Sequence, residues 1–260
     1  IEITVDRIMK ILGLLLVFLA LSLVEPKTEC IRYTQSESGT ITNPFDSNTA
    51  TPNAFCFVII NVGKKRIDFN FSVKTPQMKN NICNGGVLLV HRGKQIPSFC
   101  ESDNTTVKIE SASPVSVVFS RKFYIPHTEF NLSYTTEMAN ESEITDINHD
   151  VMCETLISDN RGSIMSPGYP HGYEANLICT VMVKTSLLFK TNHFALSTDV
   201  DTCTDALLVL NPFGEAKLTF CHSCSRNIFT VPAGGGLIFF TGDQMSKSEG
   251  FQFLYGEVDG

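Results

Sequence analysis

Apolar and polar residues alternate along several stretches of the chain. Between Ile67 and Val73 every second residue is apolar, and the residues between them are aspartate, asparagine and serine. The same period of two recurs at 130–134 and at 251–255. Successive side chains of a strand point to opposite faces of a sheet, so this pattern predicts strands with one buried and one solvated face.

A second group of segments is apolar at consecutive positions. These runs are Val87–Val90, Val115–Phe119, Ala206–Leu210 and Leu237–Phe240. Glycine and proline residues lie between the runs, and no segment beyond residue 24 has helical periodicity. Short strands separated by regular turn signals are typical of a β-sandwich, so we expect an all-β protein.

The amino-terminal apolar run extends over residues 11–24 and is shorter than the about 20 residues that a membrane-spanning helix needs. Its length favours a signal peptide, and Ala20-Leu-Ser22 predicts cleavage after the serine. Met9 is the first methionine and acidic residues precede it. We therefore interpret residues 1–22 as a signal peptide with an upstream extension. An amino-terminal membrane anchor is the alternative.

Composition and charge narrow the class of protein. Apolar residues make up 43% of the chain, which excludes a wholly disordered protein. The net charge of −7 argues against nucleic acid or an anionic membrane surface as the main partner. No second apolar run reaches about 18 residues, so we expect no membrane insertion. Four N-x-S/T sequons fit a secreted glycoprotein, at Asn70, Asn104, Asn131 and Asn140.

The cysteines repeat along the chain. The nine are Cys30, Cys56, Cys83, Cys100, Cys153, Cys179, Cys203, Cys221 and Cys224. In each set of four, the first and second cysteines are 26 residues apart, and the third and fourth are 17 or 18 apart. A repeat of about 100 residues indicates a duplicated domain and not a solenoid unit. We therefore predict two modules, 30–135 and 153–258.

The segment between the modules, 136–152, has a different composition. It carries five acidic residues and no lysine or arginine. Such a composition indicates an extended, solvated linker, and a short amphipathic helix is the alternative.

The second module strongly resembles a CUB domain. The resemblance lies in Gly162-Ser-Ile-Met-Ser-Pro-Gly-Tyr-Pro170, in Tyr173, Asn176 and Cys179, and in the closing Gly250-Phe251 and Tyr255. The first module has the same cysteine spacing without these motifs, as a degenerate relative would. The resemblance implies tandem jelly-roll-like β-sandwiches, each of two antiparallel sheets and stapled by disulfides that join the first cysteine to the second and the third to the fourth.

The implied disulfides are Cys30–Cys56, Cys83–Cys100, Cys153–Cys179 and Cys203–Cys221. This pairing leaves Cys224 as a free thiol, or as the link of a disulfide-bonded dimer. Cys224 could also compete with Cys221 for Cys203. A redox role for this C-x-x-C spacing is disfavoured, because no βαβ pattern accompanies it.

The resemblance also implies a calcium site in the second module. Many CUB domains hold one Ca²⁺ with an acid before the third cysteine, an aspartate after it and an aspartate in the last loop. Asp205 and Asp243 match two of these positions. Ser197 or Thr198 aligns with the remaining one, and Asp199 and Asp201 are the acids nearby. Convergent carboxylates are the hard oxygen ligands that Ca²⁺ prefers. The first module has no matching acids, so we expect no calcium there.

Catalysis is not expected, because the chain has neither a histidine pair with zinc-ligand spacing nor a nucleophile motif. CUB modules bind protein or sugar. We therefore expect a non-catalytic extracellular binding protein that recognises a protein, or less readily a glycan, through loops of its second module. A fragment of a CUB-containing protease and a matrix component cross-linked through Cys224 are the alternatives.

Overall fold

The computed structural model describes residues 30–42, 54–74, 87–95, 106–120, 129–138, 152–196, 203–221, 226–242 and 248–258. Every regular element in these ranges is a β-strand, which confirms the all-β prediction. No described segment forms an apolar helix of the length that a membrane crossing requires. The expected signal peptide lies outside the described residues.

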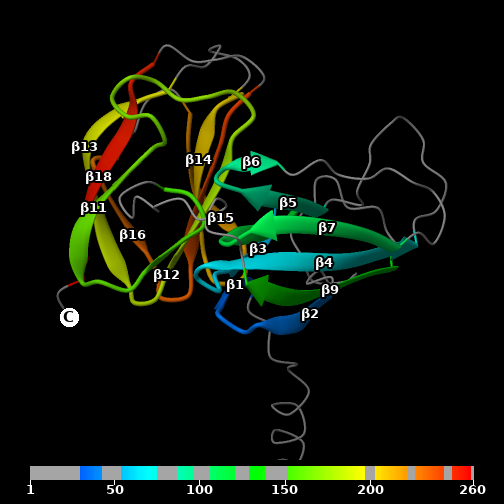
Figure 1. Ribbon diagram of the computed structural model, residues 1–260. Helices are drawn as coiled ribbons and strands as arrows, with labels where there is room; N and C mark the ends of the chain where they lie inside the picture. Colours follow the sequence, from blue (N-terminus) through cyan, green and yellow to red (C-terminus); the bar gives the residue numbers. More distant parts are fainter. Residues whose placement is uncertain are drawn as a thin grey trace, which may run out of the picture.

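Strands β1–β9 form a sandwich of two sheets, which we call the first sandwich (Figure 1). Its strands are β1 (Ile31–Thr34), β2 (Ser38–Thr42), β3 (Phe55–Ile60), β4 (Lys65–Lys74), β5 (Val87–His91), β6 (Lys94–Gln95), β7 (Thr106–Ala112), β8 (Val115–Ser120) and β9 (Glu129–Met138). One sheet has the order β1-β3-β8-β5-β6 and the other β2-β9-β4-β7.

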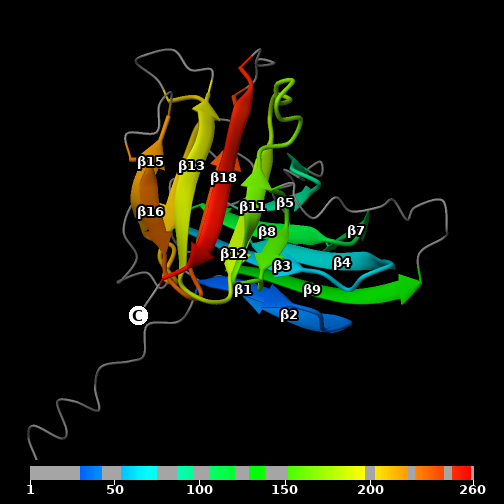
Figure 2. The ribbon, with the colours of Figure 1, turned by 90° about the vertical axis from the view of Figure 1, so that its left-hand side faces the viewer.

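Strands β10–β18 form the second sandwich (Figure 2). They are β10 (Thr155–Ile157), β11 (Arg161–Met165), β12 (Ile178–Val183), β13 (Leu187–Ala195), β14 (Ala206–Leu210), β15 (Ala216–Phe220), β16 (Ile228–Val231), β17 (Gly236–Phe240) and β18 (Gly250–Glu257). Its sheets have the orders β10-β12-β17-β14-β15 and β11-β18-β13-β16. Each strand of the second sandwich thus occupies the position that the strand numbered nine lower occupies in the first sandwich. The repeat in the cysteines is therefore also a repeat in topology.

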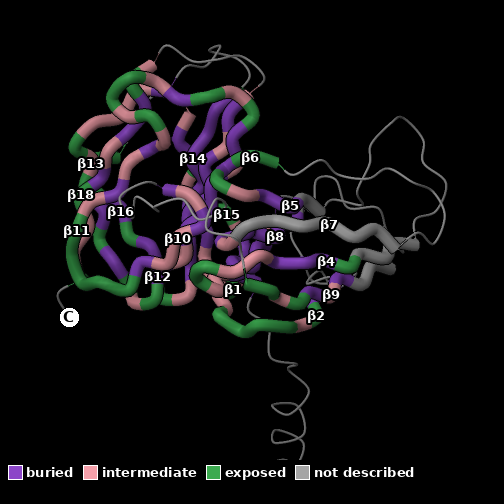
Figure 3. Tube along the Cα trace, in the orientation of Figure 1, coloured by how far each residue is buried: buried purple, intermediate pink, exposed green. Residues whose placement is uncertain are grey.

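The two sandwiches pack against each other through their five-stranded sheets. A single buried cluster contains residues from both halves: Ile31, Phe57, Ile59, Val90, Val118, Leu208, Leu210 and Ile238. The burial map in Figure 3 shows buried segments on both sides of this junction. The consecutive apolar runs belong to these sheets, which explains their pattern, because both faces of each sheet are covered.

The junction is built twice, by equivalent residues. The Ile178 N–H donates to the Gly93 carbonyl at 2.7 Å, and the Phe55 N–H donates to the Gly214 carbonyl at 2.9 Å. Gly93 follows β5 and Gly214 follows the equivalent strand β14. The contact therefore has the reciprocal form of an isologous interface, within one chain.

Side chains at the centre of the junction differ between its two equivalent contacts. Gly236 lies so close to Phe57 that a Cβ at this glycine would come within 2.8 Å of the phenylalanine ring. At the equivalent positions, the Ser116 and Thr180 hydroxyls lie 2.5 Å apart and share a buried hydrogen bond. Phe57 opposite Gly236 at one contact therefore occupies the same place in the repeat as Thr180 opposite Ser116 at the other.

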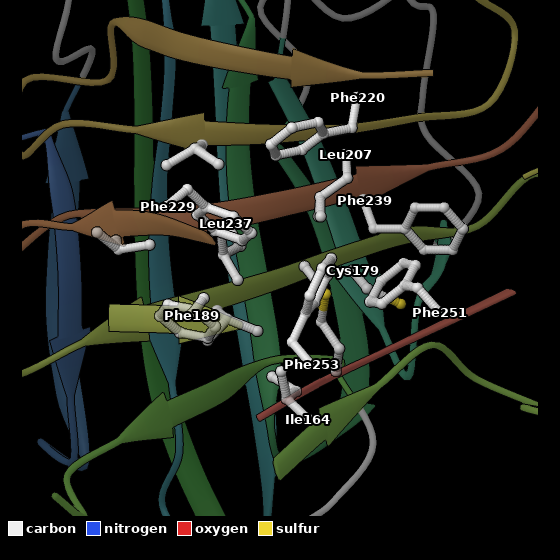
Figure 4. Close-up of a cluster of buried hydrophobic side chains, with 14 of the residues drawn as sticks. Ile164, Cys179, Phe189, Leu207, Phe220, Phe229, Leu237, Phe239, Phe251 and Phe253 are labelled. Atoms are coloured by element: carbon white, nitrogen blue, oxygen red, sulfur yellow. The ribbon is translucent and has the colours of Figure 1, made fainter. Parts of the chain in front are cut away.

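Each sandwich also has its own core between its sheets. In the second sandwich this core is rich in phenylalanine (Figure 4). Phe189 and Phe229 stack with ring centroids 5.4 Å apart, and Phe253 meets Phe229 edge to face at 5.3 Å. Such ring pairs add to the stabilisation from apolar burial.

Three sequence predictions need correction. The resemblance implies antiparallel sheets, but β1 pairs in parallel with β3, and β10 with β12, so each five-stranded sheet is mixed. Asp68 was expected on the solvated face of its strand, but it is 3% exposed, and the Arg66 Nε lies 3.4 Å from its Oδ1. The expected linker begins too early, because β9 continues to Met138 by pairing with β4. At its other end Met152 is fully buried. Residues 139–151 lie outside the described residues.

Candidate functional site

The predicted calcium ligands are only partly covered by the structure. Asp205 is described, whereas Asp199 and Asp243 lie outside the described residues. In the described part of the chain no three histidine, cysteine, aspartate or glutamate residues form a group that could hold a metal. Asp205 is therefore the residue from which the candidate site is built.

The Asp205 side chain is buried, with 3% of its surface exposed, and both carboxylate oxygens accept a hydrogen bond. The Tyr173 hydroxyl donates to Oδ2 at 2.7 Å, and the Gly242 N–H donates to Oδ1 at 2.7 Å. Tyr173 is itself held edge to face against Phe239, with ring centroids 5.3 Å apart. One carboxylate thus ties together three segments that are distant in sequence.

Thr241 continues the same network. Its hydroxyl donates to the Glu174 carbonyl at 2.9 Å and accepts from the Leu177 N–H at 2.9 Å. The Asn176 N–H donates to the Gly242 carbonyl at 2.8 Å. The segment before β12 and the segment after β17 are therefore fixed to each other beside Asp205, at one end of the second sandwich.

Three disulfides lie in the described residues: Cys30–Cys56, Cys153–Cys179 and Cys203–Cys221. They are three of the four pairs that the resemblance implies. Cys203–Cys221 lies next to the candidate site, because Cys203 is two residues before Asp205. Cys83, Cys100 and Cys224 fall outside the described residues.

Two of the four sequons lie in described strands. Asn70 is in β4 with its side chain exposed, as a glycan acceptor must be. Asn131 is in β9, at the register position paired with Ser72 of β4. Asn104 and Asn140 are outside the described residues.

Sequence reasoning did not identify Glu154 as a notable residue. It is 2% exposed and lies at the junction of the sandwiches, where its Oε1 accepts the Gly93 N–H at 3.3 Å. Burial raises the pKa of the Glu154 carboxyl to about 8, against a smaller lowering by the backbone amides of Gly93 and Arg92. A comparison of the two repeats could have pointed to Glu154, because it follows Cys153 just as the apolar Ile31 follows Cys30.

Sequence reasoning also gave no role to Tyr173, Thr241 or Gly242, although Tyr173 is part of the motif that resembles a CUB domain. The side-chain and backbone groups that hold Asp205 come from separate loops. Only the folded sandwich brings these loops to one end, so the spacing of the residues carries no sign of the network.

No protein-family model matches the sequence, and no curated protein matches it. Among solved structures, the chain is similar to the CUB1-EGF-CUB2 domains of rat MASP-1, with 14% identity over 87% of this chain and all (100%) of that one, at a TM-score of 0.35. For the MASP-1 CUB2 domain bound to Ca²⁺, identity is 16% over 40% of this chain and 99% of that one, at a TM-score of 0.34. The full extracellular region of zebrafish Gpr126/Adgrg6 is 13% identical over 88% of this chain and 36% of that one, at a TM-score of 0.32.

Proposed function

We propose that the protein is a non-catalytic extracellular binding protein built of two CUB-type modules, 30–135 and 153–258. The loops at the Asp205 end of the second module would contact a protein ligand, or less readily a glycan. The observation that carries this proposal is the buried Asp205 carboxylate, which fixes loops from three parts of the chain. Prearranged loops lose less conformational entropy on binding, so such an end is suited to recognition.

The disulfides support an extracellular location. The three disulfides within the described part of the chain are typical of oxidising compartments and rare in the cytosol. The exposed Asn70 sequon fits the same compartment. Secretion, glycosylation and dimer formation through Cys224 are parts of the proposal.

Calcium fits the chemistry of this end of the module. Each oxygen of Asp205 accepts one hydrogen bond and keeps a further lone pair, so the carboxylate can still ligate a hard cation. Asp243 directly follows Gly242, whose amide binds Asp205. We propose that Asp205 and Asp243 would hold Ca²⁺, with Asp199 as the third acid, and that the ion would bring these loops into one arrangement for the ligand.

Substitutions at Asp205 and Tyr173 test the proposal. In the wild-type protein, about 1 mM calcium should raise the melting temperature of the second sandwich, since the ion binds only the folded state. Asp205→Asn should abolish this rise, because it removes the charge while keeping the side-chain shape. Tyr173→Phe, the control, should lower the melting temperature and retain the calcium response, because it removes one hydrogen bond and no charge.

Ligand capture provides the second readout. The mature chain, carrying a photocrosslinker in the 173–177 loop, is incubated with extracellular fluid in calcium or in EDTA. A crosslinked species that EDTA and Asp205→Asn both remove, and that Tyr173→Phe retains, would support the proposal. A wild-type chain without a calcium-dependent melting shift would refute the metal site. Crosslinking that Asp205→Asn leaves unchanged would show that ligand binding does not depend on the Asp205 carboxylate, and the absence of any crosslinked species would refute the binding role of these loops.

A further inference from the structure

The outer face of the second sandwich exposes apolar side chains. This face belongs to the sheet β11-β18-β13-β16, which lies toward the viewer in Figure 2 and on the side away from the first sandwich. Its exposed apolar residues are Leu188, Ile228 and Leu254, with 37%, 52% and 44% of their surface exposed. Leu254 of β18 and Ile228 of β16 flank Lys190 of β13 in the sheet register.

The fold does not require apolar residues at these positions. In the equivalent sheet of the first sandwich, Asn70 takes the place of Lys190, and Ser133 takes the place of Leu254. Polar residues at these positions are therefore compatible with the same strand order. Exposed apolar residues that cluster on one face, and that packing does not require, are typical of a surface that contacts another molecule.

The two equivalent faces also differ in their sequons. Asn70 lies in an N-x-S sequon and is exposed on the outer face of the first sandwich. The second sandwich contains no sequon in any of its strands. A glycan on the first face would keep proteins away from it, whereas the second face stays uncovered. This asymmetry selects the second face as the one available for a protein contact.

The charge of this face defines the partner. Arg161 of β11 and Leu188 of β13 both lie in register with Gly256 of β18, which separates them. Arg161 is exposed, as is Lys190. No described outward position of β11, β13, β16 or β18 carries an acidic residue. The nearby Glu249, which directly precedes β18, is paired with His193 of β13 at 2.9 Å. Glu257, at the end of β18, pairs with the inward-facing Leu187. An apolar patch with two basic residues, on a chain of net charge −7, complements an apolar surface that carries carboxylates.

We propose that the outer face of the second sandwich, centred on Lys190, Leu254, Ile228 and Leu188, is a docking surface for a protein segment with large apolar side chains and at least one carboxylate. The carboxylate pairs with Lys190, and the apolar side chains cover the two leucines and the isoleucine. This surface lies on a sheet and not at the Asp205 loops, so binding to it requires no calcium and does not depend on the proposed function of those loops.

Selection from a peptide library provides the probe. A phage-displayed library of random dodecapeptides is selected on the immobilised mature chain in EDTA, and binding of enriched peptides is measured by fluorescence anisotropy. We expect enrichment of peptides with aspartate or glutamate between large apolar residues. Lys190→Glu should weaken their binding about tenfold by placing like charges together. Leu254→Ser, which installs the residue of the first sandwich, should weaken binding to a similar degree.

A glycan placed on the face gives the decisive variant. Lys190→Asn combined with Asn192→Thr creates a sequon where the first sandwich has its own, and the attached glycan should abolish peptide binding. Asn70→Gln, which removes the glycan acceptor of the other face, is the matched control and should leave binding unchanged. Each variant should melt close to the wild type, because the substituted side chains are exposed and the hydrogen bond from Asn192 to Gln252 that Asn192→Thr removes is exposed as well. A library without enriched acidic peptides, or peptides that bind the glycosylated variant as well as the wild type, would overturn the proposal.

Discussion

The residue that follows the first cysteine of each module is buried in both sandwiches, but its chemistry differs. Ile31 is fully buried and Glu154 is 2% exposed. Burial disfavours the charged form of Glu154 and raises the pKa of its carboxyl to about 8. Arg92 is the charged group that acts on it. On the turn between β5 and β6, Lys94 also forms an ion pair with Glu174, at 2.7 Å, which joins the two halves. His91 lies on the same turn, and burial lowers the pKa of its imidazole.

Glu154 predicts a pH dependence of stability. Its pKa is raised from 4.5 to about 8 in the folded state, so between these values the folded chain keeps a proton that the unfolded chain releases. The stabilisation is complete below pH 4.5 and is lost as the pH rises through about 8. Urea unfolding between pH 5 and pH 8 should show wild-type stability falling relative to Glu154→Gln, by up to about 1.4 kcal/mol per pH unit. Parallel curves for the two proteins would contradict this assignment.

At the scale of the elements, the turn between β5 and β6 and the turn between β14 and β15 hold the junction together. Gly93 and Gly214 occupy these turns with φ values of 73° and 74°, a region that residues with a Cβ rarely adopt. A Cβ at Gly93 would come within 2.7 Å of the Cys179 Sγ, and a Cβ at Gly214 within 2.5 Å of the Cys30 Sγ. Each turn therefore inserts against a disulfide of the opposite sandwich, and only glycine allows this approach.

Substituting Gly93 with alanine should weaken the junction. Gly63 is a matched control, because it has a φ of 69° with no atom within 4 Å of an added Cβ. Gly63→Ala adds only the strain of the left-handed backbone, about 1 kcal/mol. Gly93→Ala adds the clash with the disulfide, for a total of about 3 kcal/mol or more. Urea unfolding measures both losses, and equal losses would show that the turn does not depend on the close approach.

On the scale of the whole molecule, the two sandwiches pack against each other and are not joined by the linker alone. They share the apolar cluster that contains Phe57 and Ile238, and backbone hydrogen bonds from Ile178 and Phe55 cross the junction. Two copies of the same sandwich would pair less well. Two copies of the first sandwich would place Phe57 against Ser116, and two copies of the second would place Thr180 against Gly236. The junction therefore selects one copy of each half.

Cleavage between the halves should leave them associated. A specific protease site placed within residues 143–151 is cut in the folded protein, and gel filtration at micromolar concentration follows. The fragments should elute together and separate on a non-reducing denaturing gel, because the described disulfides each lie within one half. Deglycosylation should change only the amino-terminal fragment, since all four sequons lie at or before Asn140. Fragments that elute apart would show that the linker holds the halves together.

Much of the fold could be predicted from local patterns. The period of two around Phe69 and Phe253 predicted strands whose inner faces are buried, because alternation is a local consequence of the pleat. Asp68 departs from this pattern: it is buried on the face expected to be solvated, with the Nε of Arg66, two residues away on the same face, 3.4 Å from its Oδ1. The acidic composition of 136–152 concealed the end of β9, since pairing with β4 outweighs intrinsic preference there.

The sequence by itself determined the strand content and the duplication and singled out Asp205, because periodicity, cysteine spacing and a motif are properties of neighbouring residues. Only the tertiary structure decided what the consecutive apolar runs face. Leu207 and Val209 point into the core of their own sandwich, whereas Leu208 and Leu210 point into the junction with the other. A run of apolar residues says that both faces are buried, but the covering surface lies far away in the chain. Tyr173 and Gly242 likewise meet Asp205 only after the loops converge. The pKa of the Glu154 carboxyl is raised only because the opposite sandwich excludes water from it.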